Sequence, residues 1–243
     1  MSGNAPPCAM PIADDEVHLW LAVRPGMPGH DDGSALLSPA EAARARRFLH
    51  DADRARFVFA HVLLRDVLGR YLGIAPADVG LDADERGKPR LANHSSPDLR
   101  FNLSHSGDAV LCGIASGREI GVDIEAAVAR EDLSRVAAHF FAPDERAALD
   151  HCTAEAHTLR FHQIWTRKEA YVKALGAGLV QPLQSFSTMG DGYEESPVRD
   201  AGASTVWHVR SVPVLDGHAA ALVVEGAGAR LSCRRWPGVG RVA

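Results

Sequence analysis

The segment Trp165-Thr-Arg-Lys-Glu-Ala-Tyr-Val-Lys-Ala-Leu-Gly-Ala-Gly-Leu179 combines a helical pattern with several chemically useful side chains. Its apolar residues recur at the spacing of one helix face, and Gly176 stands where a helix would end. Glu169 and Lys173 lie four positions apart, with the acid nearer the N-terminus, so they share one side of that helix. We expect one long helix, over residues 153–175, to end in this segment.

Two shorter segments upstream belong with it: Phe101-Asn-Leu-Ser-His-Ser-Gly-Asp108 and Ile120-Gly-Val-Asp-Ile-Glu125. Both have the apolar patterning of strands. Asp123 and Glu125 are two positions apart, so on a strand their carboxylates leave the same face. The apolar residues beside them would then enter the core.

The composition is that of an ordinary globular protein, since 46% of the 243 residues are hydrophobic and 23% are charged. A formal charge of −5 argues against general nucleic-acid binding. The four cysteines are scattered without a CxxC pair, which argues against a zinc site or a disulfide scaffold and favours a reducing cytosol. The sequence shows neither a signal peptide nor an apolar run long enough to span a bilayer. We therefore expect a cytoplasmic protein that binds neither nucleic acid nor membrane.

The order of the expected elements indicates an α+β protein made of two similar halves with a pseudo-twofold layout. The first half is expected to contain a strand, helices and further strands, and the second half helices followed by strands. We expect a loose tail over residues 1–16, an N-terminal half over 17–118 and a C-terminal half over 119–243.

Within this outline the sequence predicts individual elements. Ser38 can cap a helix that Pro39 opens, Glu41 can close a capping box, and this helix would end near His50. A second helix would cover 53–71. Further helices are expected at 132–141 and from Pro143, strands at 17–23, 79–81, 100–104, 185–188, 205–212, 219–224 and 230–236, and a hairpin of 109–115 with 120–125 around Ser116-Gly117.

Two carboxylates on a rigid strand suit Mg²⁺, which binds a few carboxylates and leaves its other positions to water and phosphate. Taken alone, Asp123 and Glu125 are more simply a solvated strand face, because Asp-x-Glu is a common pattern. Glu169 would supply a third carboxylate if its helix packs over the strand. The alternative for Glu169 is an exposed pair with Lys173, which would contribute only about 0.3–0.5 kcal/mol.

The segment after residue 103 offers groups for binding an anion directly after a strand. Ser104 supplies a hydroxyl, His105 an imidazole, and Gly107 allows the backbone to approach a diphosphate closely. A polar turn between two strands is the simpler alternative. A nucleophilic serine paired with His105 is disfavoured, because adjacent residues at a strand end point apart. Lys88, on an expected turn, is a further candidate for a phosphate contact.

Four motifs stand in a characteristic order and spacing: Gly87-Lys-Pro89, Phe101-Asn-Leu-Ser-His-Ser-Gly107, Gly121-Val-Asp-Ile-Glu125 and Trp165-x-x-Lys-Glu-Ala-x-x-Lys-Ala-x-Gly-x-Gly-Leu179. Together they resemble the 4′-phosphopantetheinyl transferase superfamily, and in particular its larger, monomeric Sfp-type class. The resemblance covers about residues 38–186, and Phe140-Phe141 before Pro143-x-Glu145 also matches the family pattern.

The resemblance implies an enzyme that moves the 4′-phosphopantetheine arm of coenzyme A onto a serine of an apo-carrier protein and releases adenosine 3′,5′-bisphosphate. The carriers would be peptidyl or acyl carrier proteins of nonribosomal peptide, polyketide or fatty acid synthesis, which includes secondary metabolite biosynthesis. It also implies that coenzyme A and Mg²⁺ bind between the two halves of a monomer.

The resemblance also implies roles for individual residues. Asp123, Glu125 and Glu169 resemble the magnesium ligands, and Glu169 also resembles the general base. Lys173 resembles the catalytic residue that neutralises the diphosphate or protonates the leaving phosphate. The other contacts to coenzyme A would come from Ser104 and His105 at the diphosphate, with His105 also among the catalytic residues, from Lys88 at a further phosphate, and from Arg44 near the 3′-phosphate.

Two positions depart from the family pattern at the nucleotide end: Glu41 replaces a second basic residue of some relatives, and Phe57 replaces a threonine. The alternatives to Arg44 for the 3′-phosphate are Arg46, Arg47, Arg56, Arg86 and Arg90.

Two other functions stay open. One is a Mg²⁺-dependent hydrolase of nucleotide pyrophosphates that uses the same carboxylates. The other is a catalytically silent module that only docks carrier proteins, which is disfavoured because the three carboxylates and Lys173 are all present.

Overall fold

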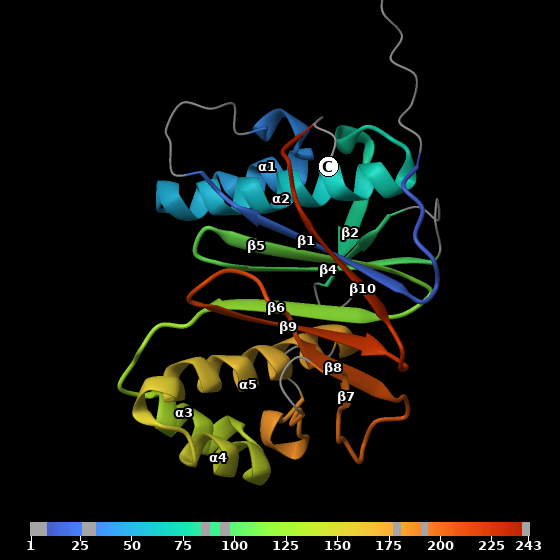
Figure 1. The fold of residues 1–243 in the computed structure, drawn as a ribbon. Coiled ribbons are helices and arrows are strands. Elements are labelled where there is room, and N and C mark those ends of the chain that lie inside the picture. Colours follow the sequence, from blue (N-terminus) through green and yellow to red (C-terminus); the bar gives the residue numbers. More distant parts are fainter. Residues whose placement is uncertain are drawn as a thin grey trace, which may run out of the picture.

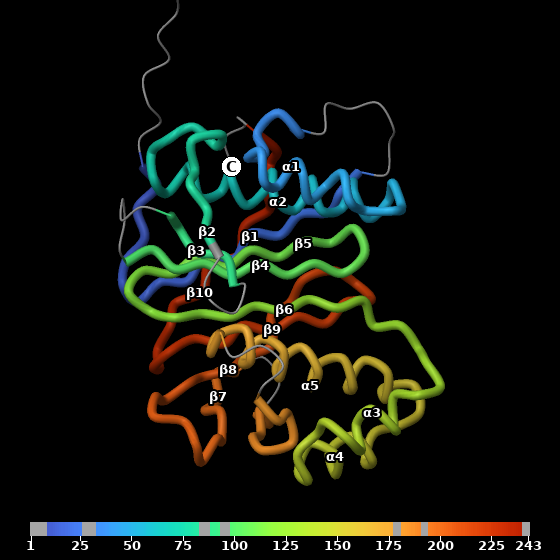
Figure 2. Tube along the Cα trace, turned by 180° about the vertical axis from the view of Figure 1, so that it is seen from behind, coloured from blue at the N-terminus to red at the C-terminus, as the bar shows by residue number. Residues whose placement is uncertain are grey.

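The structure, a computed structural model, describes residues 9–25, 33–83, 88–92, 98–176, 181–190 and 194–239. Two sheets lie face to face between two layers of helices (Figure 1), and the view from behind shows the same layers (Figure 2). The helices are α1 (Pro39–Ala45), α2 (Asp51–Leu72), α3 (Leu133–Phe140), α4 (Pro143–Asp150) and α5 (Ala154–Leu175). The strands are β1 (Glu16–Val23), β2 (Leu81–Ala83), β3 (Pro89–Leu91), β4 (Leu99–Ser106), β5 (Ala109–Ser116), β6 (Ile120–Ala126), β7 (Ser196–Pro197), β8 (Trp207–Ser211), β9 (His218–Glu225) and β10 (Arg230–Arg235).

The first sheet has the strand order β10-β1-β5-β4, and α2 covers one of its faces. Leu64 and Leu68 of α2 share a buried cluster with Trp20 of β1 and Phe101 of β4. Strand β10 runs parallel to β1, whereas β5 runs antiparallel to β1 and β4. The last strand thus comes from the expected C-terminal half but completes the first sheet. Within the expected loose tail, the side chains of residues 10 and 12 pack against this cluster.

The second sheet has the order β6-β9-β8-β7, and α5 covers its outer face. Tyr171 of α5 packs in a buried cluster with Trp207 of β8 and Val223 of β9. Both α2 and α5 are 22 residues long and end at a glycine in the left-handed region, Gly73 at φ 66° and Gly176 at φ 61°. The two sheet-and-helix halves confirm the α+β prediction. None of the helices in the described ranges is long and apolar enough to cross a membrane.

The sheets meet through a buried apolar layer and through their edge strands, β4 and β6. An edge strand leaves every second backbone N–H without a partner in its own sheet. Side chains of β4 satisfy these groups on β6: Asn102 Oδ1, Ser104 Oγ and Ser106 Oγ accept hydrogen bonds from the N–H groups of Val122 (2.8 Å), Ile124 (3.4 Å) and Ala126 (3.1 Å). This contact aligns the polar face of β4 with the acidic face of β6.

The expected hairpin of 109–115 with 120–125 is wrong. Strand β5 instead forms a hairpin with β4 around Gly107, and β6 pairs antiparallel with β9, in which Asp123 lies opposite Ala221. Segments that are close in sequence were expected to pair. Because β5 and β6 are both largely buried, they serve better as members of different sheets that pack together.

The expected strand at 185–188 is replaced by a short 3₁₀ helix, Leu183–Ser185, and one isolated bridge between Ser187 and Arg199. A buried ion pair supplies hydrogen-bond partners to the backbone of residues 183–188, which a neighbouring strand would otherwise provide. Lys168 Nζ donates to the carbonyl oxygens of residues 183 (2.7 Å) and 186 (2.8 Å), and Glu145 Oε1 accepts from the N–H of residue 188 (2.8 Å). Lys168 and Glu145 themselves lie 2.7 Å apart and are both fully buried.

The helix opened by Pro39 ends at Ala45, earlier than expected near His50. His50 is extended, with φ −104° and ψ 132°, because it is the N-cap of α2. The expected turn at 87–89 is described only from Lys88 onward, where Pro89 begins β3. The capping box predicted for Ser38 and Glu41 is confirmed.

Candidate active site

The two carboxylates of β6 leave one face of the strand, while Val122 and Ile124 enter the layer between the sheets. Asp123 is only 3% exposed, and its Oδ1 accepts a hydrogen bond from Ser104 Oγ at 2.8 Å. Glu125 Oε2 accepts one from the Ser106 hydroxyl at 2.8 Å. A solvated strand face is therefore wrong for Asp123, because its carboxylate is enclosed by β4 and α5.

Helix α5 packs directly over β6, and Gly121 makes this possible. A Cβ atom at Gly121 would lie 2.0 Å from the Ala170 carbonyl oxygen and 2.5 Å from the Ala174 backbone nitrogen. Only glycine fits at this position, because the backbone of α5 approaches the strand too closely to leave room for a side chain. This packing places Glu169 close enough to both β6 carboxylates for their charges to act on its pKa.

Lys173 lies at the junction of α5, β4 and β6. Its Nζ donates to Asp123 Oδ1 at 2.6 Å and to Ser104 Oγ at 2.8 Å. Lys173 therefore makes a cross-element ion pair, in place of the exposed pair with Glu169 that the sequence left open. Its side chain is still 29% exposed, so it can also be reached from solvent.

All three carboxylates have raised pKa values. Burial is the largest cause in each case. The negative charge of Asp123 adds to the rise at Glu125 and Glu169, whereas the positive charge of Lys173 opposes it. Carboxylates with raised pKa values in one polar site form an environment in which a bound cation would be stabilised.

The serines and the histidine of the anion-binding segment lie within β4, not after it as expected. Because side chains alternate along a strand, Ser104 and Ser106 face β6, whereas His105 shares the α2 side with Phe101. His105 is exposed. The surrounding protein still shields its ring partly from water, and this partial burial, together with the positive charge of Lys173, lowers the pKa of the imidazole and favours its neutral form.

Lys88 and Arg44 lie outside this cluster. Lys88 Nζ donates to Glu119 Oε2 at 3.3 Å and to the Ala174 carbonyl oxygen at 3.4 Å, near the end of α5. Arg44 is exposed, and its guanidinium lies 5.2 Å from the centre of the Phe57 ring. Among the alternatives to Arg44, the residues at 46, 47 and 90 are exposed, Arg56 bonds to Asp108 Oδ1 at 3.3 Å, and Arg86 lies outside the described residues.

The donor set fits a magnesium ion chemically. Asp123 Oδ2 is a buried oxygen with no hydrogen-bond partner in the described part of the chain, so it is available as a ligand. Oxygen atoms of Glu125 and Glu169 would complete a set of hard ligands of the kind that Mg²⁺ prefers. In the described ranges, however, no three His, Cys, Asp or Glu side chains are already arranged around a single metal position.

Sequence reasoning missed Asn102, Ser106 and the close contact at Gly121. Residues 102, 104 and 106 share the strand period of two, and this alternation of polar side chains was the available signal. The pattern pointed to a polar face. It gave no indication that the face would bond to the edge of a second sheet.

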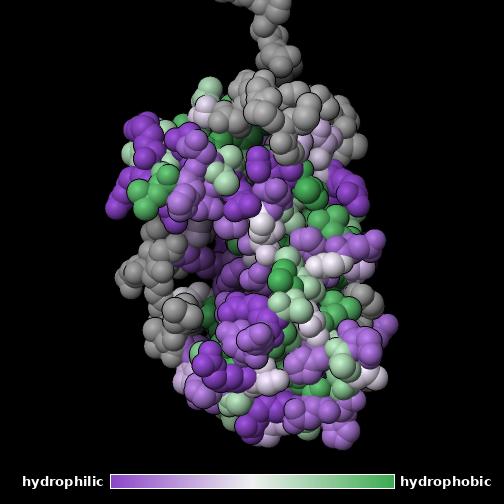
Figure 3. All heavy atoms as spheres, turned by 90° about the vertical axis from the view of Figure 1, so that its left-hand side faces the viewer, coloured by the Kyte–Doolittle hydropathy of each residue, from purple (hydrophilic) through white to green (hydrophobic). Residues whose placement is uncertain are grey.

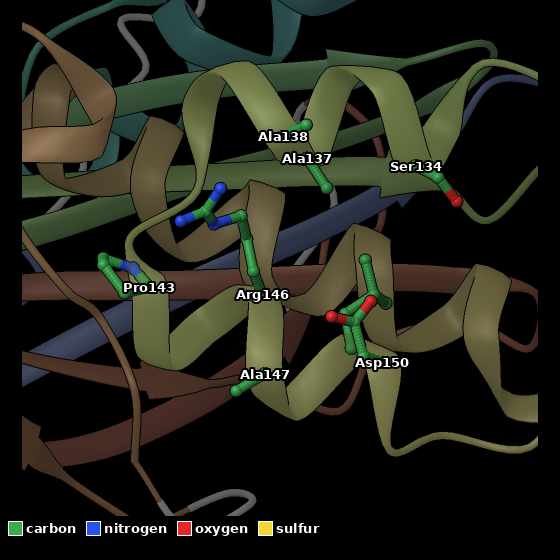
Figure 4. Close-up of a pocket in the computed structure, with 8 residues that line it drawn as sticks. Ser134, Ala137, Ala138, Pro143, Arg146, Ala147 and Asp150 are labelled. Atoms are coloured by element: carbon green, nitrogen blue, oxygen red, sulfur yellow. The ribbon is translucent and has the colours of Figure 1, made fainter.

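The surface shows two hollows of different kinds. On the face seen in Figure 3, hydrophilic residues line the coloured part of a recess between the halves. A separate groove of about 340 Å³ lies between α3 and α4 (Figure 4). Its walls include the small residues Ala137 and Ala147, together with Arg146 and Asp150, and none of the expected site residues lines it.

Comparison with known proteins gives matches over both halves. Residues 24–117 match the family model described as 4′-phosphopantetheinyl transferase, N-terminal, and residues 119–223 match the 4′-phosphopantetheinyl transferase superfamily. The two segments together span most of the chain.

Individual relatives agree with the family models. The 4′-phosphopantetheinyl transferase HetI of Nostoc sp. is 36% identical over 224 residues, which cover 91% of this chain and 93% of HetI. A putative 4′-phosphopantetheinyl transferase of Synechocystis sp. is 33% identical over 81% of this chain and 80% of its own. The 4′-phosphopantetheinyl transferase Sfp of Bacillus subtilis is 35% identical over 63% and 66%, respectively. The chain therefore belongs to the 4′-phosphopantetheinyl transferase superfamily, in its Sfp-type class.

Proposed function

We propose that this chain transfers the 4′-phosphopantetheine arm of coenzyme A to a serine of an apo-carrier protein, with the carboxylates of β6 and α5 as its centre. The observation that carries the proposal is the assembly of Asp123, Glu125, Glu169 and Lys173 at the contact between the two halves. These residues come from two segments, β6 and α5, and the family resemblance implied a role in this centre for each of them.

We propose further that Mg²⁺ binds at Asp123, Glu125 and Glu169. The buried Asp123 Oδ2 without a partner and the raised pKa values of all three carboxylates support this assignment. When bound, the ion would offset the negative charge of the diphosphate and stabilise the charge that develops on the leaving oxygen.

Glu169 is the general base of the proposed reaction. It accepts the proton of the carrier serine as the serine oxygen forms a bond to the phosphorus next to pantetheine. The bond from that phosphorus to the bridging oxygen breaks, and its electron pair leaves with adenosine 3′,5′-bisphosphate. Burial and the charge of Asp123 raise the pKa of Glu169, which strengthens it as a base.

Lys173 and Ser104 hold the leaving group. Lys173 is partly exposed and already bonds Ser104 Oγ, so both can turn toward a diphosphate that enters beside β4. A positive charge fixed at this position neutralises the departing phosphate without rearrangement of solvent. His105 on the other side of the edge strand supplies a neutral imidazole as a hydrogen-bonding group.

The proposed partners are peptidyl or acyl carrier proteins, including those of secondary metabolism. We also propose a monomer that acts in the cytoplasm. Membership of the Sfp-type class supports the choice of partners and the monomer. The scattered cysteines support the location.

The release of adenosine 3′,5′-bisphosphate from coenzyme A, measured by chromatography with and without an apo-carrier, tests this function. A transferase releases the bisphosphate only when an apo-carrier is present, and in equal amount to the carrier modified. Equal release without a carrier would establish the hydrolase alternative. No release with a panel of peptidyl and acyl carriers would contradict the proposal and favour a silent docking module.

A further inference from the structure

Glu41, which departs from the family pattern, does not bring an unpaired negative charge to the nucleotide end. Its Oε2 accepts from the Ser38 N–H at 2.8 Å and from Arg65 Nε at 2.7 Å. The Arg65 side chain is 2% exposed, so this ion pair is largely shielded from water. The second oxygen, Oε1, lies 2.8 Å from His61 Nδ1.

This contact fixes the orientation of the His61 ring. A carboxylate has no hydrogen to donate, so Nδ1 carries the hydrogen and donates it to Glu41. The ring also packs against Phe57, with centroids 4.1 Å apart. Within the described part of the chain Nε2 has no hydrogen-bond partner, and the side chain is 17% exposed. His61 therefore holds a ring nitrogen available to a ligand in a fixed position.

The charged groups near His61 are Glu41 and several cationic side chains, and the cationic side chains extend to the proposed active site. Arg44 lies over the ring of Phe57, the same ring that packs against His61. His105 of β4 lies between α2 and β6, since α2 covers one face of the first sheet and β6 borders the other. The positive charges of Lys173, His61 and Arg56 all lower the pKa of His105. Cationic groups are thus present on both sides of His105, with Lys173 toward β6 and with Arg56 and His61 on α2.

We propose that His61 determines specificity for coenzyme A by donating a hydrogen bond from Nε2–H to an oxygen of the 3′-phosphate, with Glu41 as the residue that positions its ring. Because Nδ1 already donates its hydrogen to Glu41, the ring binds the phosphate in its doubly protonated form. The inference rests on the proposed function, because it takes coenzyme A as the substrate. In the proposed complex the diphosphate of coenzyme A binds at the carboxylates, where the reaction occurs. The 3′-phosphate is the other anionic group of coenzyme A, and it would lie at the far end of the cationic groups, beside His61. Glu41 and Phe57 thus make a different nucleotide pocket from the basic residue and threonine of some relatives, with His61 as one of its donors.

Two substitutions of His61 separate the roles of its ring nitrogens. In His61→Asn the amide nitrogen replaces Nδ1, so the bond to Glu41 is kept while the Nε2 position is lost. In His61→Gln the amide nitrogen replaces Nε2. We expect His61→Asn to raise KM for coenzyme A by about ten- to a hundredfold, as for loss of a hydrogen bond to a charged group. The values of kcat, and KM for 3′-dephospho-coenzyme A, should change little, and His61→Gln should restore much of the loss.

A second measurement uses the unaltered full chain and needs no carrier protein. We expect adenosine 3′,5′-bisphosphate, and not adenosine 5′-monophosphate, to shift the Nε2 resonance of His61 in a two-bond ¹H–¹⁵N spectrum. The resonance is assigned by its absence in His61→Gln. Equal KM changes for both substrates, no change for either, or the same spectral response to both nucleotides would overturn the inference. If carriers stay unmodified while the bisphosphate still shifts Nε2, the proposed function fails and the His61 assignment stands.

Discussion

Glu169 is half-buried beside two other carboxylates, and this environment raises its pKa. We predict that Glu169→Gln lowers kcat by about a hundredfold or more, because the amide cannot accept the serine proton. The affinity for coenzyme A should fall much less, since Lys173 and Ser104 remain. Single-turnover formation of holo-carrier, together with calorimetric binding of coenzyme A, separates the two effects. Turnover close to that of the unaltered enzyme at saturating Mg²⁺ would remove Glu169 from the mechanism.

Arg44 is the residue expected at the 3′-phosphate, and the structure shows it exposed beside Phe57. We predict that Arg44→Ala raises KM for coenzyme A by about ten- to a hundredfold, because a guanidinium–phosphate hydrogen bond is lost. KM for dephospho-coenzyme A should stay nearly unchanged. Arg47→Ala is the matched control, since Arg47 is also exposed and follows the same helix. A loss confined to Arg47→Ala would transfer the role to that residue.

At the residue scale, the sequence predicted which side chains belong together but not how they bond. The spacing of Asp123 and Glu125 correctly placed both on one strand face, because side chains alternate along a strand. It could not predict that Asp123 is buried, since burial depends on α5 and β4, which are distant in sequence. An exposed pair of Lys173 with Glu169 was one alternative that the sequence left open, and Lys173 bonds Asp123 instead.

The first turn of α1 is the element whose stability depends most clearly on one carboxylate. Burial alone would raise the pKa of Glu41, but hydrogen bonds from His61, Ser38 and Arg65 outweigh it and lower the pKa to about 2 from 4.5. The folded state therefore favours the ionised form. Its stabilising contribution is complete above pH 4.5 and is lost as the pH falls from 4.5 toward 2.

We predict that Glu41→Gln lowers the free energy of unfolding at pH 7 by up to about 3 kcal/mol, at about 1.4 kcal/mol per unit of pKa. The difference from the unaltered protein should shrink below pH 4.5. Urea unfolding at pH 7, 5 and 3 measures it. Glu155→Gln is the control, because Glu155 lies in the first turn of α5 but is fully exposed. A difference that stays constant across this range would contradict the assignment.

The contact of α5 with β6 is the element packing on which the site depends. We predict that Gly121→Ala destabilises the protein by about 3 kcal/mol or more, because backbone atoms 2.0 Å and 2.5 Å from the added methyl cannot move aside cheaply. Gly202→Ala is the control, since the nearest atom to its Cβ is 3.4 Å away. Thermal unfolding measures both variants. Equal melting temperatures for the two would show that α5 does not depend on this contact.

At the element scale, helices were predicted well and strand partners were not. The capping residues of α1 and the glycine after α5 are local signals, and the structure confirms both. The partner of a strand is a distant segment: β6 pairs with β9, about a hundred residues later. The expected hairpin of β5 with β6 failed because the apolar pattern of a strand does not identify its neighbour.

At the scale of the whole molecule, the proposed site belongs to neither half alone. The second half supplies the carboxylates on β6 and α5, while β4 of the first half supplies Ser104 and His105. The ladder of hydrogen bonds from β4 side chains to the β6 backbone holds the two edges together. The sequence predicted two halves. Their register at this edge could not be predicted, because it rests on contacts between side chains and backbone across the halves.

The most direct test of this account is the mass of an apo-carrier incubated with the full chain and coenzyme A, with Mg²⁺ or with a chelator that removes divalent cations. We predict that intact mass spectrometry shows a complete phosphopantetheine addition with Mg²⁺. Chelation should abolish the addition, restored Mg²⁺ should recover it, and Asp123→Ala or Glu125→Ala should weaken it even with Mg²⁺. Addition that proceeds equally after removal of divalent cations and in these variants would contradict the central role of the β6 and α5 carboxylates.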